Sequence, residues 1–303
     1  MACFREIAKA VIKYEKLIIV CVNIAEVKEV LRDLDLNKIT FFEINTNDTW
    51  ARDHGGITVF EDGKGIINDF MFNGWGLKFA ANYDNLITGK LHSKILSNHY
   101  GYRNQLNFVL EGGAIESDGE GTLLTTAECM LSRNRNGGSS KEKIEQNLKE
   151  TFGLERVLWL NNGYLAGDDT DSHVDTLARF CAIDTIAYVQ CNDKEDEHYQ
   201  ALKEMEEELK SFRTKIGKPY RLIPLPMAEY VEFEGERLPA TYANFLILNG
   251  AVLVPKYKTS TDKKALDAVK LAFPDREIAG IDCSVLIRQH GSLHCVTMQY
   301  PKI

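Results

Sequence analysis

The stretch Phe245-Leu246-Ile247-Leu248-Asn249-Gly250-Ala251-Val252-Leu253-Val254 carries the strongest short-range structural signal in the chain. Two apolar runs flank an Asn-Gly pair, a dipeptide that favours the tight turns joining antiparallel strands. We therefore expect strands over residues 245–248 and 251–254, paired as a hairpin. Residues 262–273 have apolar side chains at helical spacing, so a helix is expected soon after the hairpin.

Strands and helices alternate in the same way along the rest of the chain. Apolar periodicity predicts helices over residues 4–14, 27–34, 85–96, 142–152 and 196–212. Short apolar and β-branched runs predict strands over residues 17–22, 39–44, 57–60, 65–67, 122–125, 157–160 and 186–189. Residues 134–143 are typical of a surface loop that leads into a helix with Ser139 or Ser140 as its N-cap. The class is α/β, and because no linker divides residues 1–303 we expect a single domain.

The bulk composition excludes several classes of protein. The 303 residues are 44% hydrophobic and 26% charged, an ordinary globular composition. A net charge of −8 disfavours nucleic acid as a partner. Seven cysteines without a CxxC pair argue against a disulfide framework or a zinc ribbon. The longest apolar run, residues 17–22, is too short to span a membrane, and no signal-peptide pattern is present, so a cytoplasmic protein is expected.

Cys295 lies in the polar segment His290-Gly291-Ser292-Leu293-His294-Cys295-Val296-Thr297-Met298-Gln299. A cysteine there is either a small buried apolar residue or a nucleophile, and the local sequence leaves both readings open. His294 is adjacent, but neighbours along a strand face opposite sides, so we do not expect it to be the base for Cys295.

His173 and Asp175 are two residues apart, which in a strand places both side chains on one face. An imidazole beside a carboxylate can serve as a general acid and base. Three more carboxylates, those of Asp168, Asp169 and Asp171, precede this pair. They indicate either a solvated acidic turn or, less favoured because no EF-hand glycine pattern follows, a hard-metal site.

Two further motifs combine acids with glycine. Asp53 ends the segment Trp50-Ala51-Arg52-Asp53, ahead of Gly55 and Gly56. A carboxylate accepts two parallel hydrogen bonds from a planar guanidinium, although a plain surface pair of Arg52 with Asp48 is the alternative. In Glu111-Gly112-Gly113 the glycines allow close backbone approach or positive φ, which would place Glu111 at the lip of a cavity, unless the segment is a plain exit from a strand.

The candidate residues are spaced rather evenly along the chain. Asp53, Glu111, His173, Asn244 and Cys295 follow one another at intervals of 58, 62, 71 and 51 residues. Five similar units, each bringing a polar residue towards one axis, would explain this spacing. Chance spacing on a doubly wound sheet is the alternative.

Taken together, the Trp50–Asp53, Glu111–Gly113, Asp169–Asp175 and His294-Cys295 motifs resemble the agmatine deiminase and bacterial peptidyl-arginine deiminase family of the guanidine-modifying (pentein) superfamily. The resemblance extends from about residue 40 to the C-terminus and includes Leu238–Phe245. It implies a five-bladed α/β propeller with pseudo-fivefold symmetry and the site on the central axis. The family has an extended segment before its first helix, so the first unit is expected to lack a strand. It commonly has glycine where this chain has Ser172.

The resemblance also implies a role for each residue. Cys295 would be the nucleophile, His173 the general acid/base, and Glu111 the group that orients His173. Asp53 and Asp175 would hold the guanidinium nitrogens. Trp50 would line the substrate channel and Asn244 would support the site. Apart from the resemblance, the acidic run of Asp168, Asp169 and Asp171 could receive a distal ammonium group of the substrate, with Asp169 and Asp171 as the expected binding residues.

The chemistry that this set would carry out is hydrolysis through a covalent intermediate. Attack by Cys295 gives a tetrahedral adduct, His173 protonates the leaving ammonia, and water hydrolyses the remaining thiouronium. We expect a small cationic guanidino substrate, with no metal or organic cofactor and with a homodimer suggested by related enzymes. Agmatine, giving N-carbamoylputrescine and ammonia, is the preferred substrate. Arginine, peptidyl-arginine, amidinotransfer and a non-catalytic guanidino-metabolite binding protein are the alternatives.

Overall fold

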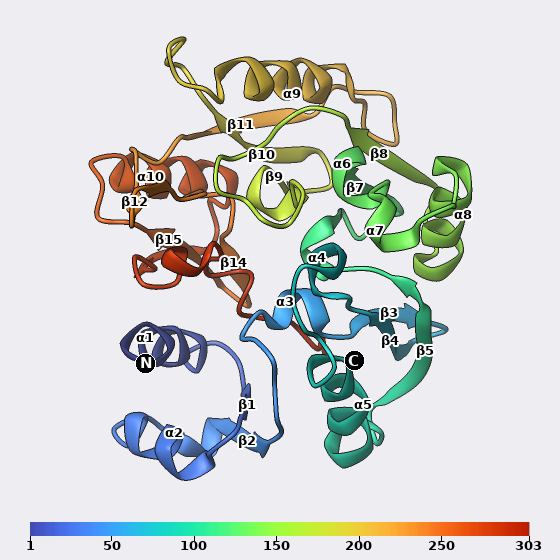
Figure 1. Cartoon of the computed structure of the whole chain (residues 1–303), viewed down its shortest axis with the longest axis vertical. Coiled ribbons are helices and arrows are strands. Elements are labelled where there is room, and N and C mark those ends of the chain that lie inside the picture. The colour runs from blue at the N-terminus through green and yellow to red at the C-terminus, as the bar shows by residue number, and fades with distance from the viewer. Residues whose placement is uncertain (303) are drawn as a thin grey trace.

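The computed structural model describes residues 1–302 and shows a mixed α/β fold built from small separate sheets (Figure 1). Four sheets share one plan, in which an antiparallel strand pair is followed by a third strand parallel to the second. Their strands are β3 (Ile57–Glu61), β4 (Lys64–Met71) and β5 (Tyr100–Val109); β6 (Ile115–Ser117), β7 (Thr122–Thr126) and β8 (Arg156–Leu160); β9 (Ala178–Ala182), β10 (Thr185–Gln190) and β11 (Arg221–Pro226); and β14 (Leu246–Leu248), β15 (Ala251–Lys256) and β16 (Glu277–Asp282).

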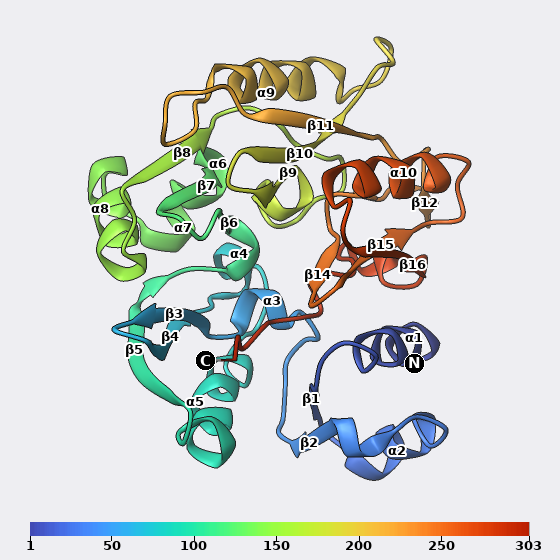
Figure 2. The ribbon, with the colours of Figure 1, turned by 180° about the vertical axis from the view of Figure 1, so that it is seen from behind.

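The N-terminal sheet has two strands where those four have three. Strand β1 (Leu17–Cys21) pairs in parallel with β2 (Ile39–Glu43), after helix α1 (Ala2–Val11). The short hairpin of β12 (Glu232–Phe233) and β13 (Glu236–Arg237) completes the set of sheets in the described residues. The two opposite views show the five larger sheets following one another around the molecule (Figures 1 and 2). A single doubly wound sheet is therefore excluded, because no sheet within residues 1–302 exceeds three strands or closes on itself.

A helical segment links the two parallel strands of each larger sheet. These links are α2 (Ile24–Val30), α5 (Ile87–Leu91), α8 (Lys141–Phe152), α9 (Tyr199–Ser211) and α10 (Asp262–Ala272). Short helices occur at α3 (Ala51–His54), α4 (Gly74–Leu77), α6 (Ala127–Met130) and α7 (Arg133–Asn136). Among residues 1–302, no helix is both long and apolar enough to cross a bilayer.

The predicted hairpin around Asn249-Gly250 is confirmed, since Leu246 pairs with Leu253 and Leu248 with Ala251. The predicted N-cap of α8 is also confirmed, because the Ser140 hydroxyl accepts the Lys143 N–H at 3.3 Å. Helix α2 ends four residues earlier than predicted and begins at Ile24, where the Asn23 side chain caps the N–H groups of the first turn.

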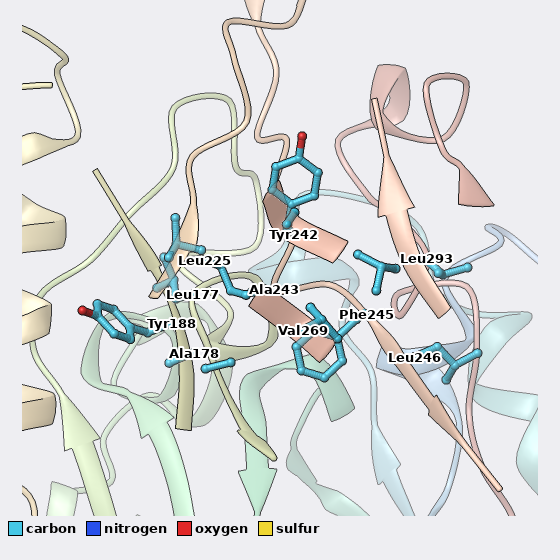
Figure 3. Packing of buried hydrophobic residues seen from close by; sticks show 14 of the residues in the cluster. Leu177, Ala178, Tyr188, Leu225, Tyr242, Ala243, Phe245, Leu246, Val269 and Leu293 are labelled. Atoms are coloured by element: carbon cyan, nitrogen blue, oxygen red, sulfur yellow. The ribbon is translucent and has the colours of Figure 1, made fainter. Parts of the chain in front are cut away.

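The largest part of the core lies between the sheets of the C-terminal half. Figure 3 shows its side chains converging from β9–β11, α10 and the segment around β14; those labelled are Leu177, Ala178, Tyr188, Leu225, Tyr242, Ala243, Phe245, Leu246, Val269 and Leu293. Tyr242 is fully buried, and its hydroxyl bonds to Asp262 at 2.8 Å and to two threonines. This packing anchors Asn244 and Leu293, which flank the candidate site.

Candidate active site

The C-terminal segment lies against α3 in the middle of the molecule (Figure 1). The Arg52 N–H donates to the Cys295 carbonyl at 3.0 Å. Gly291 packs so closely on Trp50 that an added Cβ would lie 2.2 Å from the indole. Trp50 and Cys295 are both buried, at 6% and 8% exposure, and share one apolar cluster with Phe72 and Trp75. The two motifs, more than two hundred residues apart in sequence, therefore form one site.

Gly113 marks the point where three of the predicted residues meet. A Cβ at this glycine would lie 2.6 Å from His173 Nδ1, 2.8 Å from Asp53 Oδ1 and 3.2 Å from Asp175 Oδ2. Glycine is therefore needed here for close approach and not for positive φ, because its φ is not in the left-handed region. The imidazole and two carboxylates face one small volume.

The backbone that brings His173 and Asp175 together differs from the expected strand. His173 precedes a 3₁₀ turn, Val174–Thr176, so the strand argument for their shared face was wrong. Ser172, just before it, has φ 61°, a left-handed conformation that favours glycine. The glycine that the family resemblance implies at this position would adopt this conformation without strain.

One oxygen of Asp175 is held by two donors and the other is free. Oδ2 lies 2.7 Å from His294 Nδ1 and accepts from Asn244 Nδ2 at 3.2 Å. His294 Nε2 lies 3.1 Å from Nη2 of Arg179, and a guanidinium can only donate. Nε2 is therefore the unprotonated nitrogen, and Nδ1–H donates to Asp175. The second oxygen, Oδ1, is buried and has no hydrogen-bond partner among the described residues.

Electrostatics around Asp175 and His294 follow from this burial. Burial raises the pKa of Asp175 to about 7; His173 opposes the rise and Asp53 adds to it. Burial, with the charges of Arg179 and Arg52, holds the pKa of His294 well below its ordinary value. His294 is thus neutral at physiological pH, in agreement with its role as acceptor from Arg179. The segment around His294 and Cys295 is irregular and not a strand, so the argument that alternation along a strand separates their side chains was wrong.

Asp53 is anchored through both oxygens. Oδ1 accepts the Gly113 N–H at 3.0 Å, and Oδ2 accepts the indole N–H of Trp75 at 3.0 Å. His173 Nδ1 lies 3.6 Å from Oδ1. Burial lowers the pKa of His173, but the charge of Asp53 and contacts with Cys129 and Glu111 outweigh it, so the pKa lies well above its usual value. His173 is an imidazolium at neutral pH.

Glu111 lies behind His173, and its predicted position at the lip of a cavity is wrong. The residue is fully buried, and Nε of Arg135 donates to its two oxygens at 2.8 and 3.0 Å. Its Oε2 lies 3.9 Å from His173 Nε2. Burial raises the pKa of Glu111, but His173 and Arg135 together hold it below its usual range. Arg135 was missed because it falls in the polar segment 134–143, which was predicted to be a surface loop.

Glu111, Cys129 and His173 place three potential metal-ligand atoms within 4.8 Å of one another. Arg135 already occupies the Glu111 carboxylate and would repel a divalent cation. The Glu111 carboxylate therefore suits the neighbouring His173 imidazolium better than it suits a metal ion. The acidic turn is no better suited to a metal, since Asp168 accepts from Thr170 and from the Ser172 N–H.

Cys295 sits beside Asn244, whose Oδ1 lies 3.3 Å from the Cys295 sulfur and 2.9 Å from the His294 backbone nitrogen. Asn244 therefore connects the cysteine to Asp175. Burial, followed by the charges of Asp175 and Asp53, raises the pKa of the Cys295 thiol well above its ordinary value. The thiol of the free protein is therefore protonated at neutral pH.

The two acids expected to receive a distal ammonium differ in the structure. Asp171 is not a free anion, because Lys78 Nζ bonds it at 2.7 Å and Arg135 Nη1 pairs with its other oxygen. Asp169 is partly buried, and its carboxylate has no hydrogen-bond partner among residues 1–302, although its backbone carbonyl accepts from Lys78. Burial and Asp168 raise the pKa of Asp169.

Comparison with known proteins identifies relatives over nearly the whole chain. The family model for Porphyromonas-type peptidyl-arginine deiminase matches residues 1–301. A Porphyromonas gingivalis structure named "Putative Arginine Deiminase" is 55% identical with a TM-score of 0.96, covering 99% of this chain and 89% of that one. A substrate-bound C315S agmatine deiminase of C. jejuni is 41% identical with a TM-score of 0.90, covering 97% and 85%. A Vibrio parahaemolyticus protein named "Putative agmatine deiminase" is 37% identical over 87% of this chain and 78% of its own length.

Proposed function

This chain belongs to the Porphyromonas-type peptidyl-arginine deiminase family, and on that premise we propose that it hydrolyses agmatine to N-carbamoylputrescine and ammonia. The protein is a hydrolase acting on C–N bonds in linear amidines. Its similarity to the substrate-bound agmatine deiminase of C. jejuni supports agmatine as the substrate. The side chains around Gly113 supply the groups that this reaction requires.

The observation that carries the proposal is the free oxygen of Asp175. A buried carboxylate oxygen without a donor is costly, so a ligand with N–H groups stabilises it. A guanidinium offers five N–H donors in one plane. With Asp53 on the other side of Gly113, the two carboxylates can hold the cation and orient its carbon towards Cys295.

Substrate binding would also activate the nucleophile. The cation neutralises Asp53 and Asp175, the two charges that raise the pKa of the Cys295 thiol. The thiol proton is released to solvent, the thiolate sulfur bonds to the guanidinium carbon, and the C–N bond to one terminal nitrogen then breaks. His173, protonated before substrate binds, gives its proton to that nitrogen, which leaves as ammonia.

The second half of the reaction uses the same histidine as a base. His173, now neutral, takes a proton from water, and the resulting hydroxide attacks the thiouronium carbon. The C–S bond of this adduct breaks, its hydroxyl proton is lost so that the neutral ureido product forms, and the Cys295 thiolate takes up a proton to return to the thiol. The Glu111 carboxylate, 3.9 Å from Nε2, favours the charged imidazolium electrostatically, and Arg135 keeps Glu111 ionised.

The far end of the substrate site favours an ammonium over a carboxylate. Asp169 offers an unpaired carboxylate, whereas Lys78 is already paired with Asp171. The α-carboxylate of arginine would need a free cation, for which Arg52, Arg133 and Arg179 are the candidates. Arg179 is committed to Glu116 and to the carbonyls of Ala243 and Phe245, and Arg52 bonds Gln299, whereas Arg133 is exposed. Agmatine has an amine and no carboxylate at this end, which matches the free Asp169.

The proposal includes the five-unit propeller with the site on its axis. Asp53, Glu111, His173 and Asn244 lie just before β3, β6, β9 and β14, the first strands of the four three-stranded sheets. Cys295 follows the last strand of the last sheet, so one functional group comes from each of five places around the molecule. A cytoplasmic location and a homodimer remain part of the proposal.

An ammonia-release assay over agmatine, arginine and a peptidyl-arginine tests the function. We expect release from agmatine with a kcat/KM at least tenfold above that for arginine. Citrulline formation from arginine or from the peptide, with agmatine inert, would refute the assignment. Tight agmatine binding without turnover would indicate a binding protein instead.

A further inference from the structure

The backbone of α4 is a left-handed turn. Gly74, Trp75, Gly76 and Leu77 have φ of 68°, 55°, 84° and 70°. Tryptophan and leucine disfavour this conformation, since the Cβ approaches the following carbonyl. Only glycine fits position 74, where a Cβ would lie 2.1 Å from the carbonyl oxygen of Phe79. Strained backbone of this kind persists only when the surrounding contacts over-determine it.

Several hydrogen bonds hold the turn in place. The Asn73 side chain accepts the Gly76 N–H at 2.9 Å and donates to the Asn134 carbonyl at 2.6 Å. The Asn73 carbonyl accepts the Leu77 N–H at 3.0 Å. Lys78, directly after the turn, bonds the Asp169 carbonyl at 2.6 Å. The turn is therefore fastened at both ends to segments that flank the substrate site.

The turn presents one polar atom to the site, the indole N–H of Trp75. This N–H donates to Asp53 Oδ2 at 3.0 Å, in a buried contact. The ring is 5% exposed and packs edge-on against Phe72 and Phe79, with centroids 4.8 and 5.6 Å away. It shares the apolar cluster that contains Cys295. Packing and hydrogen bonding together fix the position of the indole.

We propose that Trp75 is a positioning residue for the deimination: it fixes the Asp53 carboxylate in the orientation that receives the guanidinium, and the strained turn holds the indole there. This inference deepens the proposed function and rests on it. Asp53 has one other anchor, the Gly113 N–H on Oδ1. Without the indole, the carboxylate can rotate about that bond towards His173 Nδ1, which is 3.6 Å away. The Asp53–His173 ion pair, already present at 3.6 Å, would then shorten and compete more strongly with the substrate cation for Asp53.

The test is a double-mutant cycle measured by agmatine binding to protein that carries Cys295→Ala, so that no turnover occurs. Trp75→Phe keeps an aromatic ring but removes the N–H together with the volume of one ring of the indole. We expect it to weaken agmatine binding on the order of tenfold, as loss of a charge-assisted hydrogen bond would. Asp53→Ala should weaken binding more, and the Asp53→Ala/Trp75→Phe pair should bind no worse than Asp53→Ala alone. Trp159→Phe is the matched control, because it also removes a ring and an indole N–H, which donates to Glu145 at 2.9 Å in a different apolar cluster, and it should leave the affinity within about twofold.

Additive effects of the two substitutions would overturn the proposal, since Trp75 would then act independently of Asp53. An unchanged affinity in Trp75→Phe would overturn it as well. Melting temperatures of all variants show whether the fold is kept, and an equal loss of affinity in Trp159→Phe would overturn the proposal, because the effect would then not depend on the contact with Asp53. Failure of the wild-type protein to release ammonia from agmatine would refute the proposed function, whereas an active wild type with additive effects refutes only the role of Trp75.

Discussion

Lowering the pH should weaken agmatine binding because Asp175 must be ionised to hold the guanidinium. Burial and the nearby Asp53 raise the pKa of Asp175 to about 7, against an ordinary value of 3.8. Below this pH the carboxyl is protonated in the free protein, so binding must release one proton. Above it the carboxylate is already present and binding releases none. The sign is therefore fixed: affinity is full above pH 7 and falls as the pH drops through 7.

The size of the loss in agmatine affinity follows from the single proton that Asp175 must release when agmatine binds. Each pH unit below the pKa costs about 1.4 kcal/mol, or tenfold in affinity. Between the plateau and pH 5 the dissociation constant should therefore rise by about a hundredfold, or roughly 2.7 kcal/mol. His294 does not contribute, because its pKa lies well below the ordinary histidine value. His173 remains charged over this range, because its pKa is raised.

Isothermal titration of agmatine into Cys295→Ala protein measures this directly. Titrations in two buffers with different ionisation enthalpies should show about one proton released at pH 6 and almost none at pH 8. Asp175→Asn is the matched control: it should bind agmatine weakly and with a much smaller pH dependence. Asp169 also has a raised pKa, so its titration accounts for any pH dependence of agmatine binding that remains in Asp175→Asn. An affinity of the Cys295→Ala protein that is constant between pH 5 and 8 would refute the reasoning.

Three further substitutions probe the framework of the site. Arg135→Met leaves Glu111 buried without its partner, so unfolding by urea should show a loss of about 3–5 kcal/mol; a loss below 1 kcal/mol would contradict a buried pair. Gly113→Ala puts a methyl group 2.6 Å from His173 Nδ1, so ammonia release should fall by at least about a hundredfold while the circular dichroism spectrum is unchanged; retained activity would show that the contact is absent. Tyr242→Phe removes a hydroxyl that bonds to Asp262 and two threonines, so the free energy of unfolding should drop by about 1–2 kcal/mol with kcat kept, and a variant of unchanged stability would contradict the packing.

The elements that the sequence predicted best are those with a local cause. The Asn249-Gly250 hairpin and the Ser140 cap depend on residues within a few positions of one another, and both are present. Strands such as β5 and β11 were not predicted. Strand β5 is largely polar and exposed, and β11 contains two prolines, so neither has the apolar run or clean alternation that identifies a strand. Their partners, β4 and β10, supply the pairing that the local sequence does not encode.

The candidate site likewise contains some residues that the sequence identifies and others that it does not. Cys295, His173, Asp53, Asp175 and Glu111 belong to recognisable motifs, and the structure brings four of them close to Gly113 or to Asn244. Arg135 and Trp75 could not be found, because their functions depend on partners 24 and 22 residues away and on burial within irregular segments. Asp171 was expected to be free because the cations that pair with it lie 93 and 36 residues away along the chain. Charge pairing over such distances is a property of the fold and leaves no local pattern.

Ammonia release from agmatine by the Cys295→Ala variant tests the central claim most directly, because that claim assigns the covalent step to one sulfur atom. We predict a rate at least about 10⁴-fold below that of the wild type, with agmatine still bound through Asp53 and Asp175. Turnover by this variant within tenfold of the wild-type rate would contradict the account.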